Sequence, residues 1–420
     1  MRRTIDDTVE QGEFRAGLRD WLRSVLHPGW ALAIEAGDDD AYAAARVEAE
    51  AGGWNPFAWM ATIGASGYAA PLWPVEYGGL SGQPWMTSVV REELDRYRLP
   101  TVALNLLGVG LVGPTIVAHG NPDQKAAHLR RILTGEEVWC QLFSEPGAGS
   151  DLASLSTRAE RDGGEWVLNG QKVWTSLAQF AHRGMLLART DPAVPKHDGL
   201  SYFLLDMKSP GVEVRPLRQI TGSAEFTEVF LTDVRVPARD LLGTAGEGWR
   251  YARTTLANER VALSGLSVDA TALSGGRRRD GWTAFLESLP DRGDPVVRQA
   301  IARLYIDQQV KELSALRAAA ARARGAEPGP EGSGHKILNA ALNQRRTNLV
   351  LDANGMAGVA WERSDTAAEA RAHAFLRARA NSIEGGTSEV LRNQVAERVL
   401  GLPREPDPDR DRPWNSSPGG

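Results

Sequence analysis

Residues 143–151 read Phe-Ser-Glu-Pro-Gly-Ala-Gly-Ser-Asp, with a proline and two glycines close together. This composition predicts a turn that follows the short apolar run ending near Phe143. The turn offers backbone N–H groups and the hydroxyls of Ser144 and Ser150, which suit an anionic or carbonyl-rich ligand. On residue chemistry alone, an ordinary turn beside a hairpin explains the stretch equally well.

A second stretch, residues 169–176, reads Asn-Gly-Gln-Lys-Val-Trp-Thr-Ser. It predicts a strand that carries the indole of Trp174 next to the hydroxyls of Thr175 and Ser176. An indole can stack on a planar ring. The alternative is again a plain hairpin strand.

A third stretch, residues 383–393, reads Ile-Glu-Gly-Gly-Thr-Ser-Glu-Val-Leu-Arg-Asn. Its glycines predict a turn into a helix, with Thr387 or Ser388 as the N-cap. A helix start with free N–H groups suits a pyrophosphate. The alternative is an ordinary capped helix with an acidic first turn.

Around these stretches the chain is ordered helical, β, helical. Residues 8–133 have the spacing of helices, and an apolar side chain recurs every fourth residue at Phe14, Leu18, Leu22 and Leu26. From residue 138 to about residue 237, short β-type runs alternate with turn signals, which predicts a compact antiparallel β unit.

From Gly248 onward, helical periodicity returns, and a long helix is expected to carry one apolar side. The residues of that side are Ile301, Leu304, Val310, Leu313 and Leu316. After Leu402 the chain is rich in proline, charge and glycine, so residues 403–420 are expected to be disordered.

Composition excludes several classes of protein. The 420 residues are 42% hydrophobic and 24% charged, which indicates two or three ordinary globular domains. A net charge of -5 gives no positive field for nucleic acid. The single cysteine, Cys140, excludes an internal disulfide, and no histidine spacing indicates a metal site. Acidic residues follow Arg2 and Arg3, and no run approaches a membrane-spanning length, so we expect a cytoplasmic protein.

Residues 108–113, Gly-Val-Gly-Leu-Val-Gly, formally match a dinucleotide-binding fingerprint. That motif needs a strand before it and a helix after it, whereas both flanks here have helical patterns. The sequence therefore favours close helix packing at these glycines over a Rossmann fold.

Taken together, the three stretches resemble the acyl-CoA dehydrogenase family, in which motifs like FSEPGAGSD, NGQKVWTS and GGTSE occur in this order. Weaker similarity covers residues 73–79 and 226–237. The resemblance implies an α+β fold with three domains. These are an N-terminal helical domain (1–133), a middle antiparallel β domain (134–245) and a C-terminal four-helix bundle (246–402).

The resemblance also implies FAD between the β domain and the last helical domain, completed by a second subunit, and hence a homodimer or homotetramer. The peptide around Leu142 and Ser144 would follow the flavin's pyrimidine side, Trp174 would cover the ring, and Ser176 would bond near N5. The implied cofactor-binding residues are Leu142, Ser144, Ser150, Trp174, Thr175, Ser176, Gly355, Thr387 and Glu389.

The catalytic base is implied to lie on a helix. Many members of the family carry a glutamate where this chain has Gly385, and Glu384 lies one residue early. Others carry it on a helix after the β domain, and residues 256–260, Leu-Ala-Asn-Glu-Arg, resemble that helix. The resemblance therefore implies Glu259 as the base, with Ser150, Arg260 and Gly385 at the substrate. The alternative for Glu259 is a surface glutamate paired with an arginine.

The implied reaction is α,β-dehydrogenation of an acyl thioester to the trans-2-enoyl thioester, with electrons passed to an electron-transfer flavoprotein. One alternative is a non-catalytic or half-active subunit of a heteromeric enzyme, since the family's arginine of an RxFG segment has no counterpart between Gly281 and Arg298. Another is an enzyme acting on a carrier-protein-bound acyl group, because an aspartate often found before the base is Ala257. A flavin monooxygenase on the same fold would not need Glu259.

Overall fold

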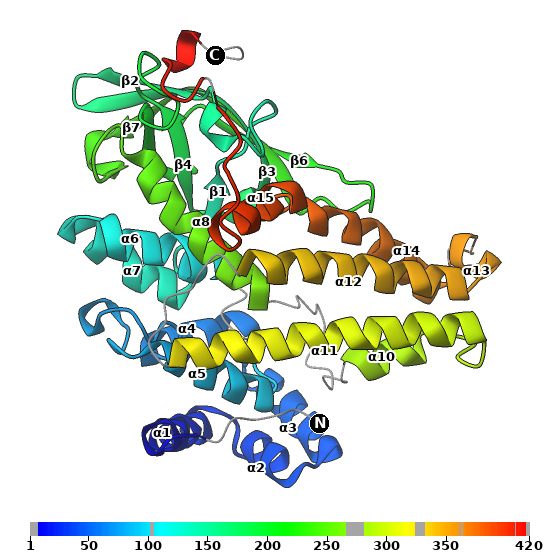
Figure 1. Cartoon of the computed structure of the whole chain (residues 1–420). Coiled ribbons are helices and arrows are strands. Elements are labelled where there is room, and N and C mark those ends of the chain that lie inside the picture. Colours follow the sequence, from blue (N-terminus) through cyan, green and yellow to red (C-terminus); the bar gives the residue numbers. More distant parts are fainter. Residues whose placement is uncertain are drawn as a thin grey trace.

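The computed structural model describes residues 7–100, 105–265, 281–323, 332–360, 362, 364–407 and 409–416. Helices form the first part of the chain and lie below the β-sheet in Figure 1. They are α1 (Val9–Val25), α2 (Pro28–Ala36), α3 (Asp39–Ala51), α4 (Pro56–Ser66), α5 (Pro84–Arg96), the π-helix η3 (Leu106–Val112), α6 (Gly113–His119) and α7 (Pro122–Thr134).

Helix α1 shows how local sequence sets this region. Thr8 and Gln11 form a reciprocal capping box that satisfies N–H groups at the helix start. Leu18 and Leu22 are fully buried, and Leu26 is 5% exposed. The predicted apolar stripe is thus confirmed, and it packs into the main hydrophobic core.

The glycines of residues 108–113 serve close packing, as predicted. A Cβ on Gly108 would lie 2.4 Å from the Asn105 side chain, and one on Gly113 would lie 2.1 Å from the Trp73 ring. The segment forms η3 and the start of α6, and η3 packs on the later helix α8 (Gly248–Gly265). Such π-helical turns are frequent at functional sites.

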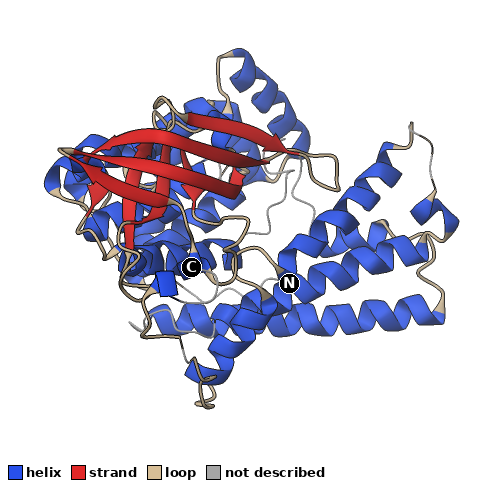
Figure 2. Ribbon diagram, turned by 90° about the horizontal axis from the view of Figure 1, so that it is seen from above, coloured by secondary structure: helices blue, strands red, loops and turns tan. Residues whose placement is uncertain are grey.

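The middle of the chain is one eight-stranded sheet, and Figure 2 looks down on it, with helices behind it and beside it. Its main path runs β6-β7-β3-β2-β4-β5-β8, and β1 pairs with β4. Most ladders are antiparallel, but β1 and β2 each pair with β4 in parallel. The strands are β1 (Trp139–Leu142), β2 (Arg158–Asp162), β3 (Glu165–Ser176), β4 (Arg183–Arg189), β5 (Leu200–Asp206), β6 (Val212–Leu217), β7 (Phe226–Pro237) and β8 (Leu241–Leu242).

Both faces of the central strands are buried. In β4, Met185 and Leu187 join the core shared with the N-terminal helices, whereas Leu186 and Ala188 join a second core on the opposite face. This alternation follows from the two-residue period of a strand. The sheet thus forms a rigid support for the loops at its ends.

The C-terminal part is helical again. Its elements after α8 are α10 (Gly281–Glu287), α11 (Pro295–Ala323), α12 (Gly332–Ala353), α13 (Met356–Val359), α14 (Thr366–Ala378), the short η7 (Arg379–Ser382) and α15 (Ser388–Arg398). Leu304 of the predicted apolar side is buried, but Val310 and Leu313 are about half exposed. In the described residues, no helix combines the length and apolar character needed to cross a membrane.

The end of the chain returns to the β-sheet, as Figure 1 shows. The N–H of Trp414 donates to the Val194 carbonyl at 2.9 Å, and the Arg189 guanidinium lies 4.2 Å from the Trp414 ring centroid. The sequence predicted a disordered tail from its proline, charge and glycine. Composition does not record that the single indole of Trp414 stacks on the buried Arg189.

We expect Trp414→Ala to release this tail. Loss of a partly buried cation–π contact of roughly 1–2 kcal/mol corresponds to about tenfold more frequent local opening. Trypsin should therefore cleave after Arg410 about tenfold faster, whereas cleavage after Arg404 serves as the internal control. Equal cleavage rates in both proteins would show that the indole does not hold the tail.

Candidate active site

The glycine loop, residues 143–151, begins where β1 ends at Leu142. Glu145 and Ala148 exchange two backbone hydrogen bonds of 3.1 and 3.0 Å, which close a tight turn. A Cβ placed on Gly147 or Gly149 would meet nothing within 4 Å. The outer side of the loop is therefore open to a ligand.

A buried ion pair fixes this loop from the inside. The fully buried ammonium of Lys172 lies 2.8 Å from the Glu145 carboxylate and donates to the Phe143 carbonyl at 3.0 Å. The backbone N–H groups of Ser156 and Thr157 also donate to Glu145. Burial alone would raise the pKa of Glu145, but Lys172 and these hydrogen bonds lower it to about 2. The loop is thus built around an ionised carboxylate.

The end of β3 lies beside the glycine loop, because the N–H of Val173 donates to the Ser144 carbonyl at 3.0 Å. Here β3 shifts its register with β7 between Lys172 and Thr175. Trp174 has a φ of 60° and is 58% exposed, and Ser176 is half-buried. This irregularity presents the indole outward, since a bulge redirects side chains.

Two of the residues expected at the cofactor have buried side chains. Thr175 lies between Trp174 and Ser176 on the strand and is fully buried, because alternate residues of a strand face opposite sides. Leu142 is fully buried within β1, and Ser144 is only partly buried. The backbone of Leu142 and Thr175 is the part left for the predicted cofactor contact.

Glu259 lies on α8 and reaches β1. The Gln141 amide donates to its carboxylate at 3.2 Å, although the two residues are 118 positions apart. Lys336 of α12 donates to the Gly386 carbonyl at 2.7 Å, and the charge of Glu259 acts on its ammonium. Glu259 itself lies beside the strand that leads into the glycine loop.

Glu384 is engaged elsewhere. Its carboxylate accepts hydrogen bonds from Arg377 at 2.8 Å and from Asn381 at 2.7 Å. Removing this carboxylate from its cationic partner would cost energy.

The turn into α15 follows the third motif. Gly385 and Gly386 have φ values of 62° and 94°, a left-handed conformation that favours glycine. Thr387 is the N-cap and accepts from the Val390 N–H at 3.2 Å. Glu389 is 77% exposed at its side chain and lies 3.6 Å from Arg392. The capped-helix interpretation is confirmed, and it leaves the helix start available for an anion.

Gly355 lies away from these residues. Gly355 follows the end of α12, whereas Lys336 lies near the start of this helix. At about 1.5 Å per residue, roughly 28 Å along the helix axis separates Lys336 from Gly355. Figure 1 shows α13, next to Gly355, at the opposite end of α12 from α15. A single chain therefore does not bring Gly355 to the glycine turn.

Comparison with known proteins identifies the family. Residues 8–136, 140–234 and 246–400 match the models described as the N-terminal, middle and C-terminal domains of acyl-CoA dehydrogenase. The chain belongs to the acyl-CoA dehydrogenase family. This confirms the resemblance in the three motifs and the helical, β, helical fold class. The acyl-CoA dehydrogenases are oxidoreductases that act on CH–CH groups.

Curated acyl-CoA dehydrogenases match most of the chain. IpdE1 of Mycobacterium tuberculosis is 37% identical over 393 residues, which cover 94% of this chain and 98% of that protein. FadE34 of the same organism is 41% identical over 340 residues, which cover 81% of this chain. That match covers only 45% of FadE34, so this chain spans about half of its length.

Solved structures share the fold over nearly the full chain. A structure titled "Tcur3481-Tcur3483 steroid ACAD" is 28% identical with a TM-score of 0.72, and covers 96% of this chain and 100% of that one. The ChsE4-ChsE5 complex from Mycobacterium tuberculosis is 26% identical with a TM-score of 0.67, with coverage of 96% and 100%.

The described residues of this acyl-CoA dehydrogenase fit the donor set that FAD requires. Trp174 exposes an indole for stacking, and Ser144 and Ser176 carry hydroxyls beside it. Open space at Gly147 and Gly149 allows a ligand to approach the loop backbone. The start of α15 suits a pyrophosphate.

Sequence reasoning missed Gln141, which donates to Glu259, and Lys336, which donates to the Gly386 carbonyl. Gln141 lies two residues before the first motif, and this position was a usable signal. Lys336 lies within a helix and outside every motif. Arg260, predicted at the substrate, has its side chain outside the described part of the chain.

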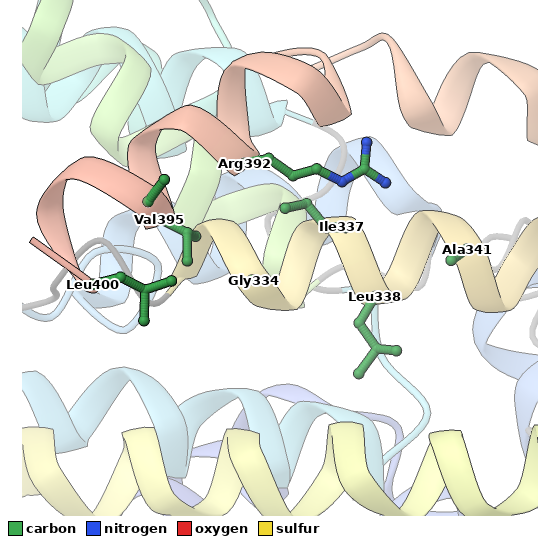
Figure 3. Close-up of a pocket in the computed structure, with 8 residues that line it drawn as sticks. Gly334, Ile337, Leu338, Ala341, Arg392, Val395 and Leu400 are labelled. Atoms are coloured by element: carbon green, nitrogen blue, oxygen red, sulfur yellow. The ribbon is translucent and has the colours of Figure 1, made fainter. Parts of the chain in front are cut away.

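An apolar pocket of about 430 Å³ lies between α12 and α15 (Figure 3). None of the predicted catalytic or cofactor-binding residues lines it. Its lining residues are Gly334, Ile337, Leu338, Ala341, Arg392, Val395, Ala396 and Leu400. The pocket is therefore distinct from the cluster around Glu259.

Proposed function

We propose that this protein is an FAD-dependent acyl-CoA dehydrogenase that forms a trans-2-enoyl thioester and passes electrons to an electron-transfer flavoprotein. The observation that carries the proposal is the contact between Glu259 of α8 and β1. Through Gln141, Glu259 meets this strand just before the glycine loop. A general base needs a carboxylate that can reach the proton and accept it.

In the proposed reaction, Glu259 accepts the α-proton of the acyl thioester. The β-hydrogen leaves with its bonding electron pair as a hydride, and the electrons of the α C–H bond form the double bond. FAD held by Trp174, Ser144 and Ser176 would supply the two-electron acceptor for this hydride. The N–H of Gly385 hydrogen-bonds to the thioester carbonyl and stabilises the negative charge that develops there.

The other site residues keep their proposed roles. Trp174 stacks on the flavin, while Ser144 and Ser176 bond to its polar edge. Ser150 and Thr387 contact the pyrophosphate, and Ser150 and Arg260 also contact the substrate. Because Gly355 lies far from the glycine turn, we propose that Gly355 and Glu389 act on FAD shared with a second subunit.

We expect anaerobic addition of a suitable acyl thioester to bleach the visible flavin spectrum of the purified holoprotein. The panel should contain short, medium, branched, aromatic and steroid-like acyl-CoA thioesters, because one similar structure is titled a steroid ACAD. The same acyl groups on a carrier protein test the alternative substrate form. A flavin that stays oxidised with every thioester would contradict the proposed function.

A second candidate is a subunit of a heteromeric acyl-CoA dehydrogenase. Two similar structures have titles that name two components, Tcur3481-Tcur3483 and ChsE4-ChsE5. Gel filtration with absorbance at flavin wavelengths distinguishes the candidates. A stable, flavin-loaded homo-oligomer of this chain alone favours the first, and a colourless protein favours the second.

A further inference from the structure

Lys336 is a buried cation outside the sequence motifs. The residue is 7% exposed, and its ammonium donates to the backbone carbonyl of Gly386 at 2.7 Å. Among the described residues, no carboxylate lies within 4.0 Å of it. Burying a charge without a close ion pair costs stability, so such a charge is often retained for a function.

Three carboxylates from three elements act on this ammonium through their charge. They belong to Glu384 of the turn after η7, Glu389 of α15 and Glu259 of α8. Burial lowers the pKa of Lys336, and the three carboxylates oppose this effect.

The bond to Gly386 has a separate consequence. Gly385 and Gly386 are both left-handed, and glycines in such a turn have many accessible conformations. A hydrogen bond from a charged donor to one carbonyl of the turn restricts the peptides on either side of it. The Gly385 N–H, which is proposed to bind the thioester carbonyl, belongs to this restricted segment.

We propose that Lys336 of α12 is a positioning residue of the active site, which holds the Gly385–Gly386 turn through the Gly386 carbonyl. The proposal rests on the proposed function for the role of the Gly385 N–H. Its effect on the turn can be measured without substrate.

The test compares wild type, Lys336→Met and Lys311→Met holoproteins. Lys311 is the matched control, because it is a partly buried lysine of α11 that bonds to Asn339 of α12. Methionine keeps the chain length and removes the charge. Replacing a buried charge with an apolar side chain of similar volume is often neutral or stabilising, so the melting temperature of Lys336→Met should not fall.

Hydrogen exchange at residues 385–387 reports on the turn without any substrate. We expect exchange to be about tenfold faster in Lys336→Met and unchanged in Lys311→Met. Unchanged exchange in Lys336→Met would overturn the positioning role. This outcome does not depend on whether any thioester reduces the flavin, so it is separate from failure of the proposed function.

The melting temperature separates the positioning role from a purely structural one. A lower melting temperature of Lys336→Met with unchanged exchange at residues 385–387 would indicate a purely structural lysine and overturn the proposal.

Discussion

Glu259→Gln is expected to slow flavin reduction by an acyl thioester about 10²–10⁴-fold, because the amide cannot accept the α-proton. Glutamine has nearly the same shape as glutamate, and its carbonyl can still accept the hydrogen bond from Gln141. Flavin content and melting temperature should therefore stay close to wild type. Anaerobic stopped-flow absorbance at a saturating thioester concentration measures the rate.

Glu384→Gln is the matched control for this experiment. It makes the same chemical change at the rival glutamate and disturbs the contacts to Arg377 and Asn381. We expect a loss of stability of roughly 1–3 kcal/mol and a much smaller change in flavin reduction. Equal rates in wild type and Glu259→Gln, with a large loss in Glu384→Gln, would move the base to the glycine turn.

The local features of the site were predictable because they depend on residues close together in sequence. The turn at residues 143–151 follows from its proline and glycines, and the N-cap at Thr387 follows from a glycine turn before a helix. The stripe of Leu18 and Leu22 predicted which side of α1 is buried, because helical periodicity depends only on the α1 sequence.

The contacts that join distant segments were not predictable in this way. Gln141 meets Glu259 because α8 packs against the sheet, and no pattern in either segment records that contact. The burial of the Thr175 side chain was not predictable, because one irregularity in β3 decides which neighbours of Trp174 face outward. The Trp414 indole packs on Arg189. Arg189 is itself buried against the loop at Ala153, to whose carbonyl its guanidinium donates a hydrogen bond.

Glu145→Gln is expected to destabilise the protein by roughly 3–5 kcal/mol, because it leaves the Lys172 ammonium buried without its carboxylate. The glycine loop is built on this pair, so flavin should also be lost at lower denaturant concentration. Urea unfolding followed by tryptophan fluorescence, together with flavin release, measures both effects. Wild-type stability would show that the pair contributes little.

The same pair predicts a specific dependence on pH. The pKa of Glu145 is lowered from an ordinary value of 4.5 to about 2 in the folded protein. Its stabilisation is therefore complete above about pH 4.5 and is lost as the pH falls toward about 2, a change of about 3 kcal/mol. Glu145→Gln should lack this part of the acid dependence.

Asp151→Asn provides a control within the same loop. Its ion pair with Lys196 has a similar length of 2.8 Å, but the Asp151 side chain is 59% exposed. Because water screens an exposed pair, this change should cost less than about 1 kcal/mol. Lys172→Met combined with Glu145→Gln should recover part of the lost stability, since it removes the buried charge left unpaired. If the double variant were no more stable than Glu145→Gln, the carboxylate's bonds to Ser156 and Thr157 would be the main contribution instead.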